Sequence, residues 1–432
     1  MDRKFEDCKK LLDITKLKNE DFGKTVNCLY FSEKMEENLV LLEVPKKMIT
    51  HILSSESGFF DIRFSGDSLK SYLITEKETF ELIEIETSNS VYLADNIDKE
   101  SSDKEEVKKV FLHSLLGSHI ECNLAKMPKL FDFKTQLFSS LLNEVTDTAD
   151  YSTSPEDLYK TIASSKIEAY IALRRLRAVT LNSEIRLCSS LLMHNVVEEI
   201  FNYCDLNGIK YSDGIPYKAA LEDVSKIYPS DLVRGLLSIY FYKMQNEGDE
   251  ILLLPQVIRI SQLYGEYLLE TISSKFALDD FLKLWQSTVP EGLSTNLNYL
   301  ISEGRAVCHQ ISANAKDILT NPKMFSIEIL KSEDLPDISE EQRINKLFSI
   351  KSDWEEPHLA GYLKDFLNEP DIERKNRISK AMDDGTDYFS DEDLEPDYTK
   401  VNGSIALVMT KFCKYDISKT PRKLHLKHQK FV

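Results

Sequence analysis

The sequence of 432 residues lacks the motifs by which common enzymes bind nucleotides, metals or acyl groups. The single Gly-Lys pair, Gly23-Lys24, has no glycine five residues before Gly23, so there is no Walker A loop. G-x-G-x-x-G, H-E-x-x-H, C-x-x-C and G-x-S-x-G are also absent. We therefore predict no catalytic residue, no metal site and no cofactor. A binding or scaffolding protein is favoured over a hydrolase with a dispersed active site.

Long apolar runs and a cysteine framework are missing as well. No stretch approaches the roughly 20 apolar residues that cross a bilayer, and the charged residues 1–7 lack the apolar core of a signal peptide. The seven cysteines follow no repeated spacing, as expected of reduced thiols in the cytosol or nucleus. Acidic residues number 72 against 54 basic ones, a net charge of −18. This balance argues against a generic nucleic-acid coat but allows a local basic patch.

Residues 1–96 show the patterns of a small β domain. Residues 60–64 alternate apolar and polar side chains, as in a half-buried strand. The apolar run Leu39–Val44 is typical of a strand covered on both faces. Residues 75–78 separate two further apolar stretches and predict a hairpin turn. Because so small a sheet or barrel is marginal alone and exposes strand edges, we expect it to assemble with a partner.

The pattern changes further along the chain. Residues 98–109 hold one apolar residue in twelve, so we predict a linker with connecting helices over 97–150. Beyond it, Ser154-Pro155-Glu156-Asp157 favours a helix start, since serine caps free N–H groups and proline fits the first turn. A second apolar helix pattern and a β-like stretch at 185–188 follow. Helix, turn, helix and strand in this order are the outline of a winged helix.

The same outline recurs to the end of the chain. Its strands are predicted at 251–254, at 306–310 paired with 325–330, and at Ile405–Met409. We therefore predict an α+β fold, in which a β-rich, barrel-type domain precedes a tandem array of winged-helix domains. The predicted boundaries are 1–96 for the β domain, 97–150 for the linker and connecting helices, 151–212 for a winged helix, 213–335 for a region of one or two winged helices, and 336–432 for the C-terminal winged helix.

An arginine cluster is the first candidate for contact with DNA. Arg174, Arg175 and Arg177 lie at the end of a predicted helix, with Arg186 nearby. Guanidinium groups bind phosphate oxygens in pairs, but cations at a helix C-terminus also offset the helix dipole, so both roles stay open. Glu168 on the same helix weakens a role in reading the groove.

The second candidate lies at the C-terminus. Residues 383–397 contain eight acids and no base, which is typical of a disordered loop and fits no EF-hand. The basic segment itself is residues 411–432, which carry a net charge of +6.

We predict that this segment binds DNA or directs nuclear import, with a solvated basic end as the alternative. The predicted DNA-binding residues here are Lys411, Lys414, Lys419, Arg422, Lys423, Lys427 and Lys430. Thr420, in a Thr-Pro-Arg-Lys sequence, is a phosphorylation candidate for proline-directed kinases.

The C-terminal half carries a series of residues that resembles a known family. Trp285-Gln286-Ser287-Thr288-Val289-Pro290-Glu291-Gly292 is followed by Leu335-Pro336, Arg343, Leu347-Phe348-Ser349, Trp354 and Leu359-x-x-Tyr362-Leu363. This order resembles the sister chromatid cohesion subunit of the alternative replication factor C clamp loader. Thr87-Ser88-Asn89 after a strand is similar to the N-terminal domain of that family. The likeness is dense between 278 and 367, and the acidic insertion departs from it.

The resemblance implies a non-catalytic architectural subunit. In that family the N-terminal β domain joins two sister subunits, the chromosome transmission fidelity proteins, in a shared triple barrel, and winged helices follow. The resemblance further implies association with the replication factor C small subunits, contact with DNA polymerase epsilon, and indirect support of PCNA loading. It implies DNA binding without sequence preference, to single or double strands, and a role in cohesion in the nucleus. No membrane partner is expected.

The alternative is a winged-helix scaffold or transcription factor of another nuclear or cytosolic complex. DNA binding at the C-terminus would favour the clamp-loader subunit over a sorting scaffold. A sequence-specific operator would favour a transcription factor.

Overall fold

The computed structural model divides the chain into two compact parts. Residues 1–58 and 81–123 form the first, here the β unit, and residues 59–80 and 124–432 form the second, here the helical unit. Helices and strands both occur, which confirms the α+β class. The structure describes residues 10, 13–16, 27–32, 35, 38–46, 48–49, 61–64, 70–94, 108–144, 153–245, 251–272, 274–311, 318–335, 339–366, 372–383, 401, 403–416 and 422–427. In these ranges, no helix combines the length and apolar content needed to cross a membrane.

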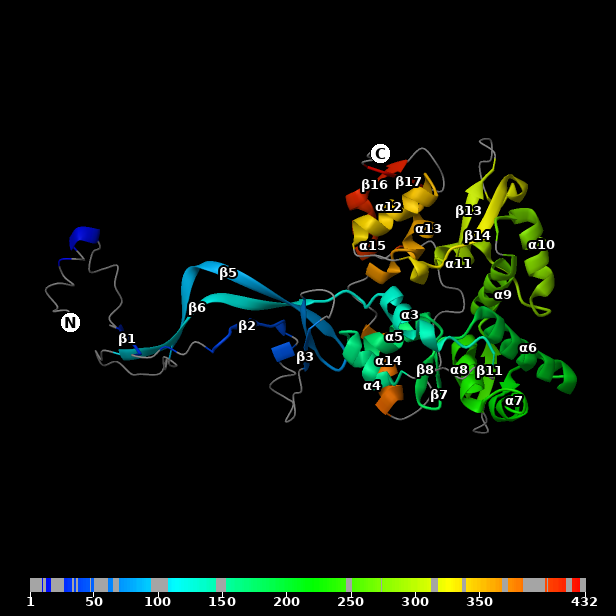
Figure 1. Ribbon diagram of the computed structural model, residues 1–432, viewed down its shortest axis with the longest axis horizontal. Helices are drawn as coiled ribbons and strands as arrows, with labels where there is room; N and C mark the ends of the chain where they lie inside the picture. Colours follow the sequence, from blue (N-terminus) through cyan, green and yellow to red (C-terminus); the bar gives the residue numbers. More distant parts are fainter. Residues whose placement is uncertain are drawn as a thin grey trace. The chain divides into compact units, whose positions relative to one another are not determined.

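Two long strands, β5 and β6, dominate the β unit (Figure 1). The first strand, β1, pairs in parallel with the start of β6, and the short β2 pairs in parallel near its end. The bounds are Asn27–Phe31 for β1, Leu42–Glu43 for β2, Thr79–Ala94 for β5 and Lys108–Leu124 for β6. These strands form an open sheet, so the barrel predicted for this region is not closed by the part of the chain that the structure describes.

Strand β6 occupies part of the range in which we expected a linker and connecting helices. Val110, Leu112, Ser114 and Leu116 are buried, whereas Phe111 and Leu115 are exposed. This alternation is the period of two that a strand requires. The strand begins within the highly charged residues 98–109, whose composition is typical of a linker, so the sequence did not predict where β6 starts.

The helical unit begins with a β-hairpin. Strand β3 (Asp61–Phe64) pairs antiparallel with β4 (Ser71–Ile74). The predicted turn at residues 75–78 is confirmed: the Thr75 N–H donates to the Glu78 carbonyl at 2.9 Å, and the chain returns into β5.

Within the described part of the helical unit, one order of elements recurs four times: helix, extended segment, helix, helix, strand, strand. In the first repeat a bridge between Leu142 and Cys188 supplies the extended segment. The first repeat comprises α3 (Leu130–Leu137), α4 (Pro155–Thr161), α5 (Lys166–Arg175), β7 (Val179–Leu181) and β8 (Glu184–Arg186). The second comprises α6 (Ser190–Asn207), β9 (Ile215–Pro216), α7 (Tyr217–Val224), α8 (Ser230–Tyr240), β10 (Phe241–Gln245) and β11 (Ile251–Pro255).

The third and fourth repeats follow the same plan. In the last three repeats the sheets have equivalent strand orders, β10-β11-β9, β12-β14-β13 and β15-β17-β16. The third comprises α9 (Val257–Ile272), β12 (Phe276–Ala277), α10 (Leu278–Thr288), α11 (Leu297–Ser302), β13 (Ala306–Gln310) and β14 (Phe325–Ile329). The fourth comprises α12 (Glu340–Ile350), β15 (Trp354–Glu355), α13 (Glu356–Gly361), α15 (Gly403–Phe412), β16 (Cys413–Asp416) and β17 (Lys423–Leu426). The strands predicted at 251–254 and at 306–310 with 325–330 are confirmed.

The prediction for the end of the fourth repeat was wrong. Ile405–Met409 lies in α15 and is not a strand. Ile405 and Met409, four residues apart, are both buried on one face of that helix, while Leu407 between them is exposed. A second difference is an additional helix, α14 (Ile372–Asp383), between α13 and α15. Apart from Asp383, which ends α14, the acidic segment 383–397 lies outside the described residues.

Candidate functional site

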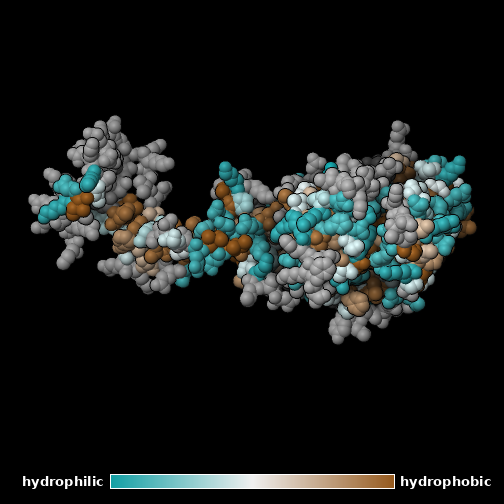
Figure 2. Space-filling model, turned by 90° about the horizontal axis from the view of Figure 1, so that it is seen from above, coloured by the Kyte–Doolittle hydropathy of each residue, from teal (hydrophilic) through white to brown (hydrophobic). Residues whose placement is uncertain are grey.

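The β unit presents many apolar side chains to solvent (Figure 2). Phe31 on β1 is 60% exposed and Leu115 on β6 is 52% exposed. The Tyr30 ring stacks on the Phe111 ring with centroids 5.4 Å apart, so side chains of β1 and β6 pack against each other within this surface. An apolar surface of this extent normally marks an interface with another protein. The exposed apolar residues of the unit include Leu29, Tyr30, Phe31, Leu39, Val40, Leu41, Leu42, Ile49, Ile83, Val91, Tyr92, Leu93, Phe111 and Leu115.

The run Leu39–Val44 departs from its prediction in a useful way. We expected a strand covered on both faces, but only Leu42–Glu43 is in a strand, and Val40 is 67% exposed. The run has the apolar content of a covered strand, but the described residues leave Val40 and Leu41 exposed to solvent. An edge strand with such a face is a template for pairing with another chain.

The basic hairpin comprises β16, β17 and the residues that flank them. It carries the described cations predicted to bind DNA: Lys411 at the end of α15, Lys414 on β16, Arg422 just before β17, Lys423 on β17 and Lys427 just after it. Lys411, Lys414 and Arg422 are exposed. Lys423 instead donates to Asp353, and Lys427 donates to the Thr410 carbonyl. Burial would raise the pKa of Asp353, but the hydrogen bond from Lys423 lowers it, so this carboxylate neutralises one of the cations. Lys419, Thr420 and Lys430 lie outside the described residues.

The arginines of the first repeat serve interior contacts. Arg174 is 8% exposed and donates to the hydroxyl and carbonyl oxygens of Ser238, both at 2.7 Å. Arg177 is equally buried and pairs with Glu266. Arg175 is half-buried, and its carbonyl accepts from Arg305. The positions of Arg174 and Arg177 therefore do not support the prediction that they contact DNA.

Glu266 is the centre of a buried charge network that joins the first and third repeats. It accepts from Arg177, and Arg305 and Lys331 both lie 3.7 Å from its oxygens. Arg305 also pairs with Glu333. Burial alone would raise the pKa of Glu266, but Arg177, Arg305 and Lys331 lower it below its usual range. The network holds the first and third repeats together.

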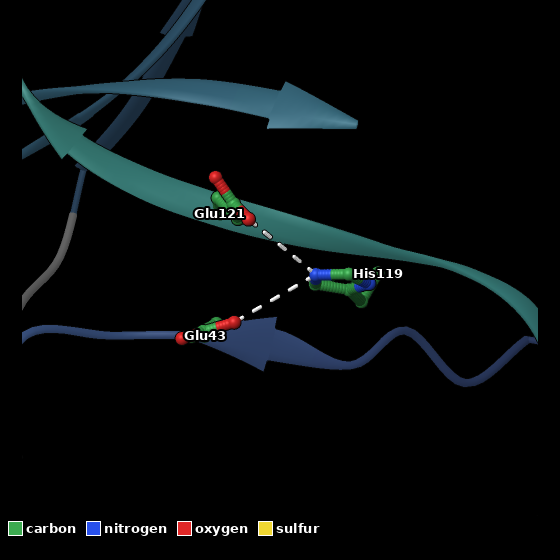
Figure 3. A group of neighbouring side chains, drawn as sticks. All are labelled: Glu43, His119 and Glu121. Carbon is green, nitrogen blue, oxygen red and sulfur yellow. Dashed lines mark ion pairs between the residues drawn. The ribbon is translucent and has the colours of Figure 1, made fainter. Parts of the chain in front are cut away.

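Glu43, His119 and Glu121 form the one group in the described chain that could hold a metal ion (Figure 3). Glu43 of β2 stands opposite Glu121 of β6 in register, and the His119 Nε2 lies 3.7 Å from an oxygen of each. Carboxylates in such positions repel each other. The imidazole, when protonated, offsets this repulsion and accounts for the cluster without a metal.

Most residues of the recognised C-terminal series are structural. Trp285 is 1% exposed, and its Nε1 donates to the Ser261 carbonyl at 2.8 Å. Arg343 is fully buried and donates to the carbonyls of Ser332, Leu335 and Tyr362. Trp285 thus holds α9 and α10 of the third repeat together, and Arg343 of α12 joins the fourth repeat to the segment 332–335 that follows the third.

Comparison with known proteins agrees with this architecture. The family model described as "Sister chromatid cohesion protein Dcc1" matches residues 39–363. The chain is 26% identical over 382 residues to the sister chromatid cohesion protein DCC1 of Xenopus laevis, covering 85% of this chain and 92% of that protein. It is 25% identical over 375 residues to DCC1 of Homo sapiens, covering 83% and 90%. The match spans both the β unit and the helical unit, and on this ground the chain belongs to the Dcc1 family of sister chromatid cohesion proteins.

Proposed function

We propose that this chain is a non-catalytic architectural subunit that acts in sister chromatid cohesion within an alternative replication factor C clamp loader. The β unit joins the sister subunits, and the helical unit extends from this joint as a scaffold. The observation that carries the proposal is the exposed apolar surface of β1, β2 and β6. The names of the relatives support the role in cohesion.

The sheet geometry supports assembly by shared strands. β1 ends the sheet order and β2 pairs through only two residues, so both have backbone groups to offer. A partner strand beside them would satisfy these groups and cover Leu29, Phe31 and Val40 at the same time. Sister subunits that complete the open sheet would produce the shared triple barrel.

The repeats of the helical unit support the winged-helix assignment. Their order of helix, strand, helix, helix and two strands is that of a winged helix, and the first strand pairs with the third in each three-stranded sheet. Four repeats fit this plan, including the first with its single bridge. In the fourth, β16 and β17 form the wing.

DNA contact is assigned to that last wing. Lys414 on β16 and Arg422 beside β17 are exposed, as is Lys411 at the end of the preceding helix α15. The three belong to a segment of net charge +6 on a chain of net charge −18. Such local positive charge attracts phosphates irrespective of base sequence. We place the protein in the nucleus, where it would contact DNA polymerase epsilon and support PCNA loading.

Co-expression with the two sister subunits tests the assembly. The expected result is a stable complex that survives size-exclusion chromatography in moderate salt. Leu115→Asp puts a charge on the apolar surface of β6 and should abolish the complex. Leu206→Asp is the matched control, because Leu206 is 84% exposed on α6 of the helical unit. Equal recovery of complex with both variants would refute this interface.

A further inference from the structure

Helix α14 lies in the fourth repeat by sequence but packs on the first. It is inserted between α13 and α15, and its contacts are with α5, some 200 residues earlier (Figure 1). The family model matches residues 39–363 and so ends before α14 begins.

A buried ion pair anchors α14. The Lys375 Nζ donates to the Glu168 Oε1 at 2.9 Å and to the Lys77 carbonyl at 3.0 Å. The other oxygen of Glu168 accepts from the hydroxyls of Thr79, at 2.6 Å, and Ser165, at 2.9 Å. Lys375 is 4% exposed and Glu168 is 2% exposed. Each charge in this anchor is thus held by several partners, as burial of an ion pair requires.

An apolar contact beside the ion pair also holds α14 against α5. Ile378 is 1% exposed and joins Met127 with Ile167 and Ile171 of α5 in a small separate core. Lys375 and Ile378 are three residues apart, so both project from the same face of α14. Asn376, Arg377 and Lys380 on the other faces are exposed. The helix has the one-sided pattern of a segment that docks into a groove.

The helix is too short to be stable by itself. It has 12 residues, and isolated helices shorter than about 12–15 residues are marginal in water. Most of its order must come from the groove, so folding and docking of α14 form one event.

We propose that α5, Met127 and the 75–79 turn form a receptor groove for a short amphipathic helix with one lysine on its docking face, and that α14 is its ligand, supplied in cis. Docked α14 covers α5, the third helix of the first repeat, which in a winged helix is the one that reads DNA. While α14 is docked, the first repeat offers no such face. The proposal does not depend on the assembly surface of the β unit or on the basic hairpin.

A peptide experiment tests the groove. In the receptor variant, residues 372–383 of the full chain are replaced by a Gly/Ser stretch of equal length. A fluorescein-labelled peptide of residues 370–385 should bind this variant saturably at one site by fluorescence anisotropy. The intact chain should bind it far more weakly, because the tethered helix has a high effective concentration.

The ion pair gives a sharper prediction. Lys375→Met in the peptide should weaken binding by about tenfold or more, and Glu168→Gln in the receptor should do likewise. The two changes together should cost less than the sum of their separate free-energy changes, because they remove one interaction. Lys380→Met is the matched control and should bind as the original peptide does. No binding, or equal effects of Lys375→Met and Lys380→Met, would overturn the proposal.

Hydrogen exchange on the intact chain decides the matter if the receptor variant does not fold. Glu168→Gln should speed amide exchange in residues 374–381 more than in α9, which the groove does not touch. Unchanged exchange in α14 would overturn the proposal as well.

Discussion

Arg177 and Glu266, 89 residues apart in the sequence, form a two-bond ion pair, with Arg177 Nη1 3.0 Å from Glu266 Oε2 and Nη2 2.5 Å from Oε1. The pair is buried, with Glu266 fully inaccessible to solvent. It joins the turn between α5 and β7 of the first repeat to α9 of the third. An arginine that the sequence offers as a phosphate ligand is thereby a structural residue.

Loss of this carboxylate should destabilise the helical unit strongly. Glu266→Gln leaves Arg177, Arg305 and Lys331 without their common partner, and breaking such a buried pair costs about 3–5 kcal/mol. Urea unfolding followed by circular dichroism measures the change. Asp279→Asn, which breaks an exposed pair with Lys283, is the control and should change stability little. Equal midpoints for Glu266→Gln and the original chain would contradict the role of the network.

The same network predicts loss of stability in acid. Although burial would raise the pKa of Glu333, Arg305 and Lys331 lower it from 4.5 to about 2. A carboxyl whose pKa is lowered by folding stabilises the folded state above its unfolded pKa, and this contribution is lost as the pH falls through the folded pKa. The free energy of unfolding of the original chain should therefore fall between pH 4.5 and about 2. The difference from Glu333→Gln should shrink over this window; a constant difference would contradict the assignment.

Short-range sequence patterns predicted much of the fold. Features that depend on contacts between residues far apart in the sequence could not be predicted in this way. The Ser154 cap and the turn at 75–78 depend on near neighbours, and both are confirmed. Ile405–Met409 is apolar enough for a strand or a helix, and packing against α12 and α13 decides between them. The α+β class could be predicted because apolar residues alternate along the strands near the N-terminus and recur at helical spacing after residue 154.

The candidate sites were harder to predict because burial decides whether a charge is available. Arg174 and Arg177 look like surface cations in the sequence, and their partners Ser238 and Glu266 lie 64 and 89 residues away. Glu168, which we took only as unfavourable to DNA, is the anchor for α14. Its Ser165-x-x-Glu168 spacing is a capping-box signal, but nothing local points to Lys375.

The basic hairpin should bind DNA with a marked dependence on salt. Changing Lys411, Lys414 and Arg422 together to Gln should weaken binding and reduce the steepness of the log–log salt dependence by about 3, if each contacts one phosphate. A titration of labelled duplex at several salt concentrations measures both. The matched control changes the exposed Lys210, Lys226 and Lys283 to Gln, with the same loss of charge elsewhere. Equal losses in both variants would mean that net charge alone governs binding.

Phosphorylation of Thr420 should oppose that binding. A phosphate adds about −1.5 to −2 charges beside Arg422 and Lys423 and competes with DNA for them. We expect several-fold weaker binding at low salt, and a shallower salt dependence, for phosphorylated protein and for Thr420→Glu. Titrations at two salt concentrations test this. Superimposable curves would show that the segment serves another purpose, such as nuclear import.

The central claim is that partner chains cover the apolar strands of the β unit, and amide hydrogen exchange tests it most directly. Exchange is compared between the chain alone and its complex with the sister subunits. We predict strong new protection in residues 27–31 and 39–43 and none in helices α6 to α8. The strands already pair with β6 on one side, so the test is the added protection: exchange of residues 27–31 and 39–43 that is the same in the complex as in the chain alone would contradict the claim.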